Sequence, residues 1–171
     1  MDNTVILIPS HLRATRLPNK PLLLINDKPM IVHCWQRAVE SKVGDVYVAT
    51  ADEEIAKIIT TVGGKSILTS KEHKTGTDRI YEAIENNFSK KPKNIINLQG
   101  DMPNIDPLAI KLLDKFIKNE SVIYAVFFKR TFFNSIRSDD PSNSGEFSIK
   151  AFKSGKFACP FQTMERSGFF P

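Results

Sequence analysis

Two cations, Arg16 and Lys20, lie four residues apart in a loop that also contains Pro18 and Pro21. The prolines restrict the backbone, so the loop can hold both cations without forming a helix. A guanidinium offers a planar fork to phosphate oxygens and an ammonium acts as a mobile point charge. The pair therefore suits a triphosphate and its leaving pyrophosphate. The alternative interpretation is a solvated surface loop.

A second candidate is Asp101, which follows Gln99 and Gly100 at the end of a β-branched run. A tight turn there would project its carboxylate over the end of a strand. Proteins hold Mg²⁺ through one or two carboxylates together with phosphate oxygens, so Asp101 is a candidate metal ligand. The alternative is a turn aspartate that accepts backbone N–H bonds.

Residues 75–79, with the sequence Thr-Gly-Thr-Asp-Arg, form a small-residue turn that leads into a helical pattern. Backbone N–H groups, a hydroxyl and the Arg79 guanidinium would meet at one helix N-terminus, where a base or a phosphate could bind. The alternative is an ordinary capped helix in which Asp78 interacts favourably with the helix dipole.

Other catalytic signatures receive no support. His33 lies beside an apolar helix face and His73 lies in a polar loop, and the sequence indicates no acid–base partner for either. A nucleophile elbow, a P-loop and a dinucleotide-binding glycine motif are all missing after the predicted strands.

The segments that must position these residues alternate between short β-branched runs and helical periodicity. This pattern predicts an α/β fold with a mostly parallel sheet. The predicted strands cover residues 4–9, 46–51, 66–69, 94–98 and 122–128. The predicted helices cover about 29–41, a segment capped by Asp52 and ended by Gly63-Gly64, about 77–87 and about 107–118.

The loops after parallel strands meet at one edge of the sheet, where open α/β sheets bind ligands. We therefore expect four charged side chains to converge on one cleft despite their separation in sequence: Arg16, Lys20, Arg79 and Asp101.

Composition limits the function classes. The chain has 171 residues, of which 41% are hydrophobic and 25% are charged, as in soluble globular proteins. Its net charge of +5 comes from lysines scattered among acids without a basic stripe, so nucleic-acid binding is not expected. Cys34 and Cys159 belong to no metal-binding pattern, which favours reduced structural thiols. Apolar runs too short for a signal peptide or membrane span predict a cytoplasmic protein.

Two regions are predicted along the chain, a nucleotide-binding domain over 1–128 and an irregular tail over 129–171. The tail contains eight of the twelve phenylalanines but has no sustained period of two or 3.6 residues, so no element is predicted there.

Taken together, the motifs resemble a known family, the 3-deoxy-manno-octulosonate (KDO) cytidylyltransferases. The resemblance runs in order through TRLP at 15–18, KPL at 20–22, KPMIVH at 28–33, VAT at 48–50, TGTDR at 75–79 and NLQGD at 97–101. Neuraminate cytidylyltransferases share parts of the first loop, but the TGTDR turn and the QGD loop favour the KDO family.

The resemblance implies a Rossmann-like nucleotidyltransferase that combines CTP and KDO into CMP-KDO and pyrophosphate for lipopolysaccharide synthesis. It implies that Arg16 and Lys20 bind the triphosphate and that Asp101 coordinates Mg²⁺. The cytosine and ribose would be surrounded by five further residues: Ser10, His11, Thr75, Gly76 and Gln99. Arg79 would join them. The family is homodimeric, and most of the surface that forms the dimer would lie beyond this chain.

Three departures from the family pattern stand out: position 11, the two positions 102 and 19, and the length of the chain. His11 replaces an arginine, with Arg13 two positions later as a displaced substitute. Met102 replaces an acidic residue after Asp101, and Asn19 replaces a glycine that precedes Lys20. Asn tolerates positive φ better than most residues.

The third departure is length, because the family continues past residue 171 with a sugar pocket and a second metal-binding aspartate. We therefore expect the chain as given to bind CTP weakly and to make little or no CMP-KDO. The alternatives are a catalytically inactive remnant that keeps the nucleotide-binding fold, and another sugar nucleotidyltransferase such as a neuraminate or molybdopterin-cofactor enzyme.

Overall fold

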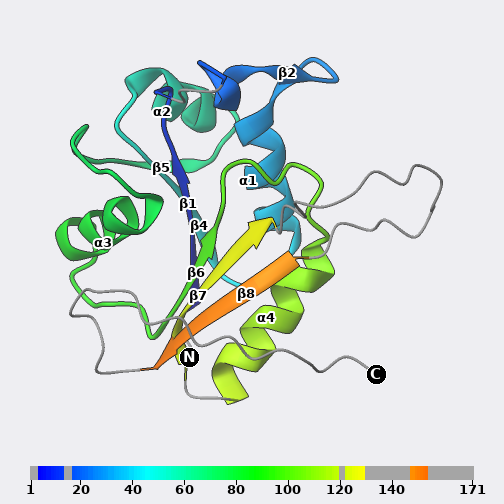
Figure 1. The fold of residues 1–171 in the computed structure, drawn as a ribbon, viewed down its shortest axis with the longest axis vertical. Coiled ribbons are helices and arrows are strands. Elements are labelled where there is room, and N and C mark those ends of the chain that lie inside the picture. The colour runs from blue at the N-terminus through cyan, green and yellow to red at the C-terminus, as the bar shows by residue number, and fades with distance from the viewer. Residues whose placement is uncertain (1–3, 14–16, 120–121, 130–146, 154–171) are drawn as a thin grey trace, which may run out of the picture.

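The computed structural model of the protein describes residues 4–13, 17–119, 122–129 and 147–153. One large sheet organises them, with the strand order β5-β4-β1-β6-β7-β8 (Figure 1). Five parallel strands correspond to the predicted ones within one residue at each end: β1 (Thr4–Ser10), β4 (Asp45–Thr50), β5 (Lys65–Leu68), β6 (Asn94–Leu98) and β7 (Val122–Lys129). The predicted α/β fold with a mostly parallel sheet is confirmed.

Within the described residues, four α-helices connect the parallel strands, as predicted. They are α1 (Met30–Glu40), α2 (Glu53–Thr61), α3 (Gly76–Asn87) and α4 (Pro107–Asn119). The residue after α2 that takes the left-handed conformation is Gly63, with a φ of 82°. Glycine reaches this conformation without a steric penalty, which explains why the helix ends there. Within the described ranges, every helix is too short or too polar to cross a membrane.

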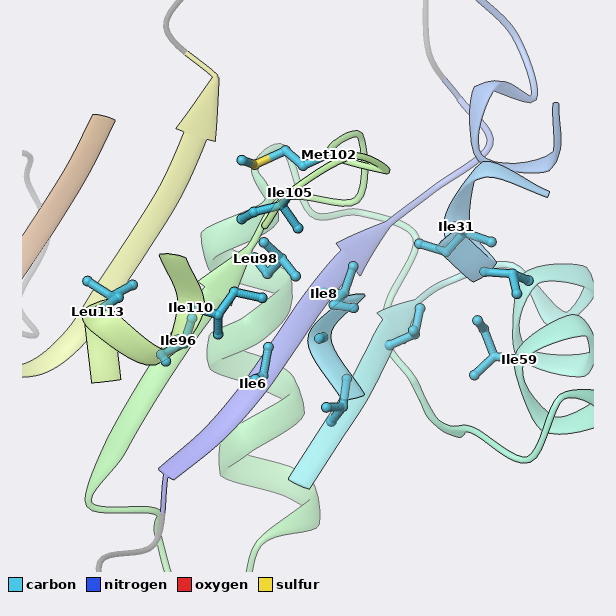
Figure 2. Close-up of a cluster of buried hydrophobic side chains, with 14 of the residues drawn as sticks. Ile6, Ile8, Ile31, Ile59, Ile96, Leu98, Met102, Ile105, Ile110 and Leu113 are labelled. Atoms are coloured by element: carbon cyan, nitrogen blue, oxygen red, sulfur yellow. The ribbon is translucent and has the colours of Figure 1, made fainter. Parts of the chain in front are cut away.

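The two faces of the sheet are covered unequally, because successive strand residues point to opposite sides. In β1, Ile6 and Ile8 face a cluster built with α1, α2 and α4, whereas Val5 and Leu7 face a cluster built with α3. Figure 1 shows α3 on one side of the sheet and α1 and α4 on the other. The larger cluster extends to Met102 and Ile105 beyond the end of β6 (Figure 2).

The loop after β1 contains short elements that the sequence analysis did not predict. They are the 3₁₀ helix η1 (Lys20–Leu22) and a hairpin of β2 (Leu24–Ile25) and β3 (Lys28–Pro29). Asn26 and Asp27 form the hairpin turn with φ values of 46° and 62°, as a two-residue turn of this hand requires. The tight loop positions Lys20 at the carboxyl edge of the sheet.

The last strand, β8 (Phe147–Lys153), pairs antiparallel with β7 and lies in the region that was predicted to be an irregular tail. Sequence periodicity did not reveal the strand, because Ala151 and Phe152 are adjacent and break the alternation of apolar and polar residues that begins at Phe147. Residues 130–146 and 154–171 lie outside the described residues, and the division at residue 128 stays a prediction.

Candidate functional site

The candidate site lies where the direction of the chain through the sheet reverses. From β1 the chain moves outward to β4 and β5, and it then returns to β6 on the other side of β1. The loops that follow β1 and β6 therefore lead in opposite directions along the sheet, and open α/β sheets bind ligands at the carboxyl edge beside such a reversal. Lys20 follows β1 and Asp101 follows β6, so both belong to this edge.

Lys20 and Asp101 meet directly, as expected. Lys20 Nζ donates to Asp101 Oδ2 at 2.8 Å, although 81 residues separate them in the chain. Their side chains are 37% and 47% exposed, so water and ligands can reach both charges. Asn19 adopts φ 56° immediately before η1, which confirms that asparagine there can replace glycine. Arg16 lies outside the described residues.

The loop after β6 and the N-terminus of α3 both lie close to Pro9 at the end of β1. A Cβ atom added to Gly100 would lie 2.8 Å from the Pro9 carbonyl oxygen, and one added to Gly76 would lie 3.0 Å from Pro9 Cγ. The first distance is too short for any side chain, and the second is tight. Glycine at these positions therefore lets the loop after β6 and the N-terminus of α3 approach β1.

Ser10, His11 and Arg13 continue from the end of β1. The Ser10 side chain is buried, and its Oγ has no hydrogen-bond partner among the described residues. His11 and Arg13 are both exposed, so either side chain could move toward a ligand at this edge of the sheet.

Thr75 caps α3, and this part of the sequence analysis is confirmed. Its Oγ1 accepts a hydrogen bond from the Asp78 backbone N–H at 3.1 Å and donates to Asp78 Oδ2 at 2.7 Å. The cap fixes the direction in which the first turn of α3, with Gly76, meets Pro9. Helix capping and ligand binding, which the sequence presented as alternatives, are compatible in this geometry.

Arg79 occupies a different environment from Lys20. Its side chain is only 3% exposed, and Nη1 donates to Thr69 Oγ1 and to the Ser70 carbonyl oxygen in the loop after β5. Burial lowers the pKa of the guanidinium from its ordinary value, while Asp52 and Glu82 oppose that shift. No contact joins Arg79 to the Lys20–Asp101 pair among the described residues, so the expected convergence of all four charges is seen for two of them.

His73 has an acidic partner that the sequence analysis missed. Its Nε2 lies in hydrogen-bond contact with Glu82 Oε2, and both Glu82 oxygens also accept from the Ser70 backbone N–H at 3.2 and 2.9 Å. These bonds lower the pKa of Glu82, with the His73 bond as the largest cause. The partners are nine residues apart across a loop and a helix, a spacing that carries no sequence signal.

Asp52 was predicted to cap α2, and it occupies the N-cap position without a capping bond from its side chain. Oδ2 instead accepts the Leu12 backbone N–H at 2.9 Å, and the Asp52 N–H donates to Thr50 Oγ1 at 3.1 Å. The carboxylate thus ties the loop after β4 to the loop after β1.

The remaining residues near Asp101 are mostly buried. Gln99 Nε2 donates to the buried Asn97 Oδ1 at 3.1 Å. Met102 is buried in the larger core cluster (Figure 2). Burial raises the pKa of the Cys34 thiol to about 12, so this group stays protonated and is a poor nucleophile.

A metal ion at this edge would rely on a single protein carboxylate. In the part of the chain that the structure describes, no three His, Cys, Asp or Glu side chains gather as a metal-binding group. Asp101 has one oxygen paired with Lys20 and is half exposed. One carboxylate completed by phosphate oxygens and water is a common way for proteins to hold Mg²⁺, so the donor set fits a metal that arrives with a nucleotide.

Comparison with known proteins agrees with this geometry. A family model described as cytidylyltransferase matches residues 5–141. The 3-deoxy-manno-octulosonate cytidylyltransferase of Methylobacterium radiotolerans is 46% identical over 111 residues, which cover 64% of this chain and 45% of that protein. The match spans about half the length of this curated relative.

Solved structures show the same relationship. CMP:2-keto-3-deoxy-manno-octonic acid synthetase in complex with CTP is similar with a TM-score of 0.64 and 39% identity, over 69% of this chain and 48% of that one. A Mycobacterium tuberculosis protein solved in complex with manganese has a TM-score of 0.54 and 13% identity, over 71% of this chain and 61% of that one. The second likeness shows the fold alone.

Proposed function

Since the chain belongs to the cytidylyltransferase family, we propose that it forms the CTP-binding part of a 3-deoxy-manno-octulosonate cytidylyltransferase. The observation that carries the proposal is the contact between Lys20 and Asp101 at the point where the sheet reverses direction. A cation for phosphate and a carboxylate for a metal lie side by side there, in a chain that is 46% identical over 111 residues to an enzyme of this name.

In the proposed reaction, the anomeric hydroxyl of KDO attacks the α-phosphate of CTP. A new O–P bond forms and the bond to the β-phosphate breaks, which gives CMP-KDO and pyrophosphate. Such a displacement depends on positioning and on electrostatic stabilisation rather than on a protein nucleophile. The buried, protonated Cys34 agrees with this absence of covalent catalysis.

Lys20 and a metal ion held by Asp101 would together neutralise the negative charge of the triphosphate. The ammonium would leave the Asp101 carboxylate, bind phosphate oxygens and offset the charge that develops on pyrophosphate. Asp101 would then hold Mg²⁺, which when bound neutralises charge on the phosphates. Arg16, in the same loop, is proposed as the second phosphate-binding cation.

The base and ribose would lie over the end of β1. Thr75 and Gly76 approach this strand from α3, and Gln99 approaches it from β6. We propose that these three residues, with Ser10 and His11, surround the cytidine. The buried and unpaired Ser10 Oγ supports a polar partner at this point, because a buried hydroxyl without a hydrogen bond is costly.

KDO is proposed as the sugar because of the matched relatives, and the complete protein is proposed to be a cytoplasmic homodimer that supplies lipopolysaccharide synthesis. The M. radiotolerans relative extends well beyond the matched segment, since the match covers only 45% of it. Binding of CTP and turnover of KDO are therefore separate questions for this chain.

Calorimetry with CTP and Mg²⁺ tests the nucleotide site. Lys20→Ala removes a charge-assisted contact worth about 1.5–3 kcal/mol, which predicts affinity lowered about 10- to 150-fold. The matched control is Lys65→Ala, because Lys65 forms a similar exposed ion pair with Asp45 at the opposite edge of the sheet. Equal losses in both variants, or no CTP binding by the native chain, would refute the proposed site.

Pyrophosphate release tests the sugar. The assay compares KDO with neuraminate, each with CTP and Mg²⁺. This chain is expected to release little or no pyrophosphate, and release at rates ordinary for enzymes, about 1 to 10³ s⁻¹, would contradict that expectation. Release with KDO alone supports the proposal. Release with neuraminate alone would assign the chain to the other sugar.

A further inference from the structure

The loop between β5 and α3 (residues 69–75) is held by charged side chains that the proposed function does not use. Thr69 continues the sheet, since its N–H donates to the Thr50 carbonyl oxygen at 2.9 Å. The loop ends at Thr75, the cap of α3. Between these two points, side-chain bonds from two α3 residues one helical turn apart, Arg79 and Glu82, tie the loop to the rest of the molecule.

Arg79 binds the first two residues of the loop, Thr69 and Ser70. Its guanidinium donates to Thr69 Oγ1 and, at 3.1 Å, to the Ser70 carbonyl oxygen. With 3% of its surface exposed, the side chain has little room to reach a ligand without breaking these bonds. A buried guanidinium without hydrogen-bond partners is expensive, so the bonds are strongly favoured over a free state.

Glu82 holds the middle of the loop. Its carboxylate accepts the Ser70 N–H through both oxygens and contacts His73 Nε2. Arg79 and Glu82 thus bind the carbonyl and the amide of the same residue, Ser70. Charge-assisted bonds of this kind are about twice as strong as neutral ones, so the loop is ordered without any ligand.

Asp52 connects this cluster to the first loop. Its charge acts on Arg79, and its Oδ2 accepts the Leu12 N–H at 2.9 Å. Leu12 follows Ser10 and His11, which are proposed to contact the nucleotide. Asp52 thus bonds the loop after β1 and acts through its charge on the cation that holds the loop after β5.

We propose that Asp52, Arg79, Glu82 and His73 form a loop brace that sets the shape of residues 69–75 and of the turn at Thr75 and Gly76. Arg79 is a positioning residue in this brace and does not touch the nucleotide. The link to nucleotide binding rests on the proposed function, whereas the ordering of the loop does not.

Trypsin tests the brace without any ligand, because Lys71 and Lys74 are exposed within the braced loop. Cleavage there requires local opening, and its rate follows the population of the open form. Glu82→Gln weakens the bonds to Ser70 and His73, which predicts cleavage after Lys71 and Lys74 at least about tenfold faster, as located by mass spectrometry. The matched control is Glu85→Gln on the same helix, since Glu85 pairs with the exposed Lys91 away from the loop.

His73 supplies a rescue test. His73→Ala is expected to accelerate cleavage, whereas His73→Gln, which can keep a donor near the position of Nε2, is expected to restore resistance. Equal cleavage of the Glu82→Gln and Glu85→Gln variants would overturn the brace, and so would failure of His73→Gln to differ from His73→Ala.

Arg79→Lys separates positioning from direct contact, since it keeps the charge but loses the planar fork. The brace predicts faster loop cleavage together with weaker CTP binding, and it predicts the same coupled losses for Thr69→Val, which leaves Arg79 in place. Weaker CTP binding with an unchanged cleavage rate in Arg79→Lys would show that Arg79 contacts the nucleotide. If the native chain binds no CTP while the cleavage results hold, the proposed function fails and the brace stands.

Discussion

Two charged clusters at the same edge of the sheet have opposite characters. The Lys20–Asp101 pair is a single contact between side chains that are 37% and 47% exposed. Arg79, at 3% exposure, belongs to a network that includes Glu82, His73 and backbone groups of the loop after β5. Exposed pairs contribute little to stability and exchange partners easily, whereas a buried charge depends on its partners. Residue type alone, a cation near a carboxylate, does not separate a ligand site from a structural support.

Arg79→Leu is expected to have the largest effect on stability. It removes the donor to Thr69 and Ser70 and leaves the negative charges of Glu82 and Asp52 without their cation. We expect the free energy of unfolding to fall by about 3 kcal/mol, the lower end of the cost of breaking a buried charge network. Denaturant unfolding measures the loss.

The control for that prediction is Arg37→Leu on α1, because Arg37 pairs with Glu40 on an exposed helix surface. Its loss should stay within about 0.5 kcal/mol. If the two variants were equally stable, the distinction between the buried and the exposed cluster would be wrong.

Lys20→Ala tests the other side of the comparison. Its free energy of unfolding should fall by at most about 1 kcal/mol, since the ion pair is exposed. The proposed loss of CTP affinity, about 1.5–3 kcal/mol, should exceed this stability loss. A variant that lost stability but kept its CTP affinity would place Lys20 with Arg79, among the structural supports.

Gly100→Ala tests how far the position of Asp101 depends on the close approach of its loop to β1. The new methyl group would meet the Pro9 carbonyl oxygen at 2.8 Å, and backbone atoms there cannot yield as a flexible side chain could. We expect a cost of about 1–3 kcal/mol in unfolding experiments. Gly76→Ala meets only the Pro9 ring at 3.0 Å and should cost less; a larger cost at Gly76 would contradict the geometry.

The smallest expected effect is a pH dependence of the loop brace. The bond from His73, followed by that from Ser70, holds the pKa of Glu82 below its ordinary value of 4.5. The folded protein therefore gains stability from ionised Glu82 above about pH 4.5 and loses it as the pH falls through the lowered pKa. Unfolding free energies of the native chain and Glu82→Gln should accordingly converge as the pH falls from about 6 to about 3. A constant difference over that range would refute the assignment.

Sequence patterns predicted the framework of the fold because strand and helix periodicities are local properties. They also predicted that Lys20 and Asp101 would meet, since parallel strands bring their carboxyl ends to one edge. The left-handed Asn19 was anticipated from its side chain.

What the sequence could not predict depends on distances between segments. The cap expected of Asp52 is replaced by a bond to Leu12, forty positions away in the chain, because the two loops lie together only in the folded sheet. The burial of Arg79 and the pairing of His73 with Glu82 have the same origin. The strand β8 was missed because its partner β7, rather than its own periodicity, defines it.

The buried Cys34 thiol can report how often α1 and the loop after β6 separate. Its side chain is fully buried on α1, and the Met102 backbone, directly after Asp101, partly offsets the rise in the thiol pKa that burial causes. A thiol reagent can reach the sulfur only when α1 and this loop separate, so the labelling rate counts those separations. With Cys159 replaced by serine, the same rate would record how firmly any bound molecule holds α1 against the loop that carries Asp101, without catalytic turnover.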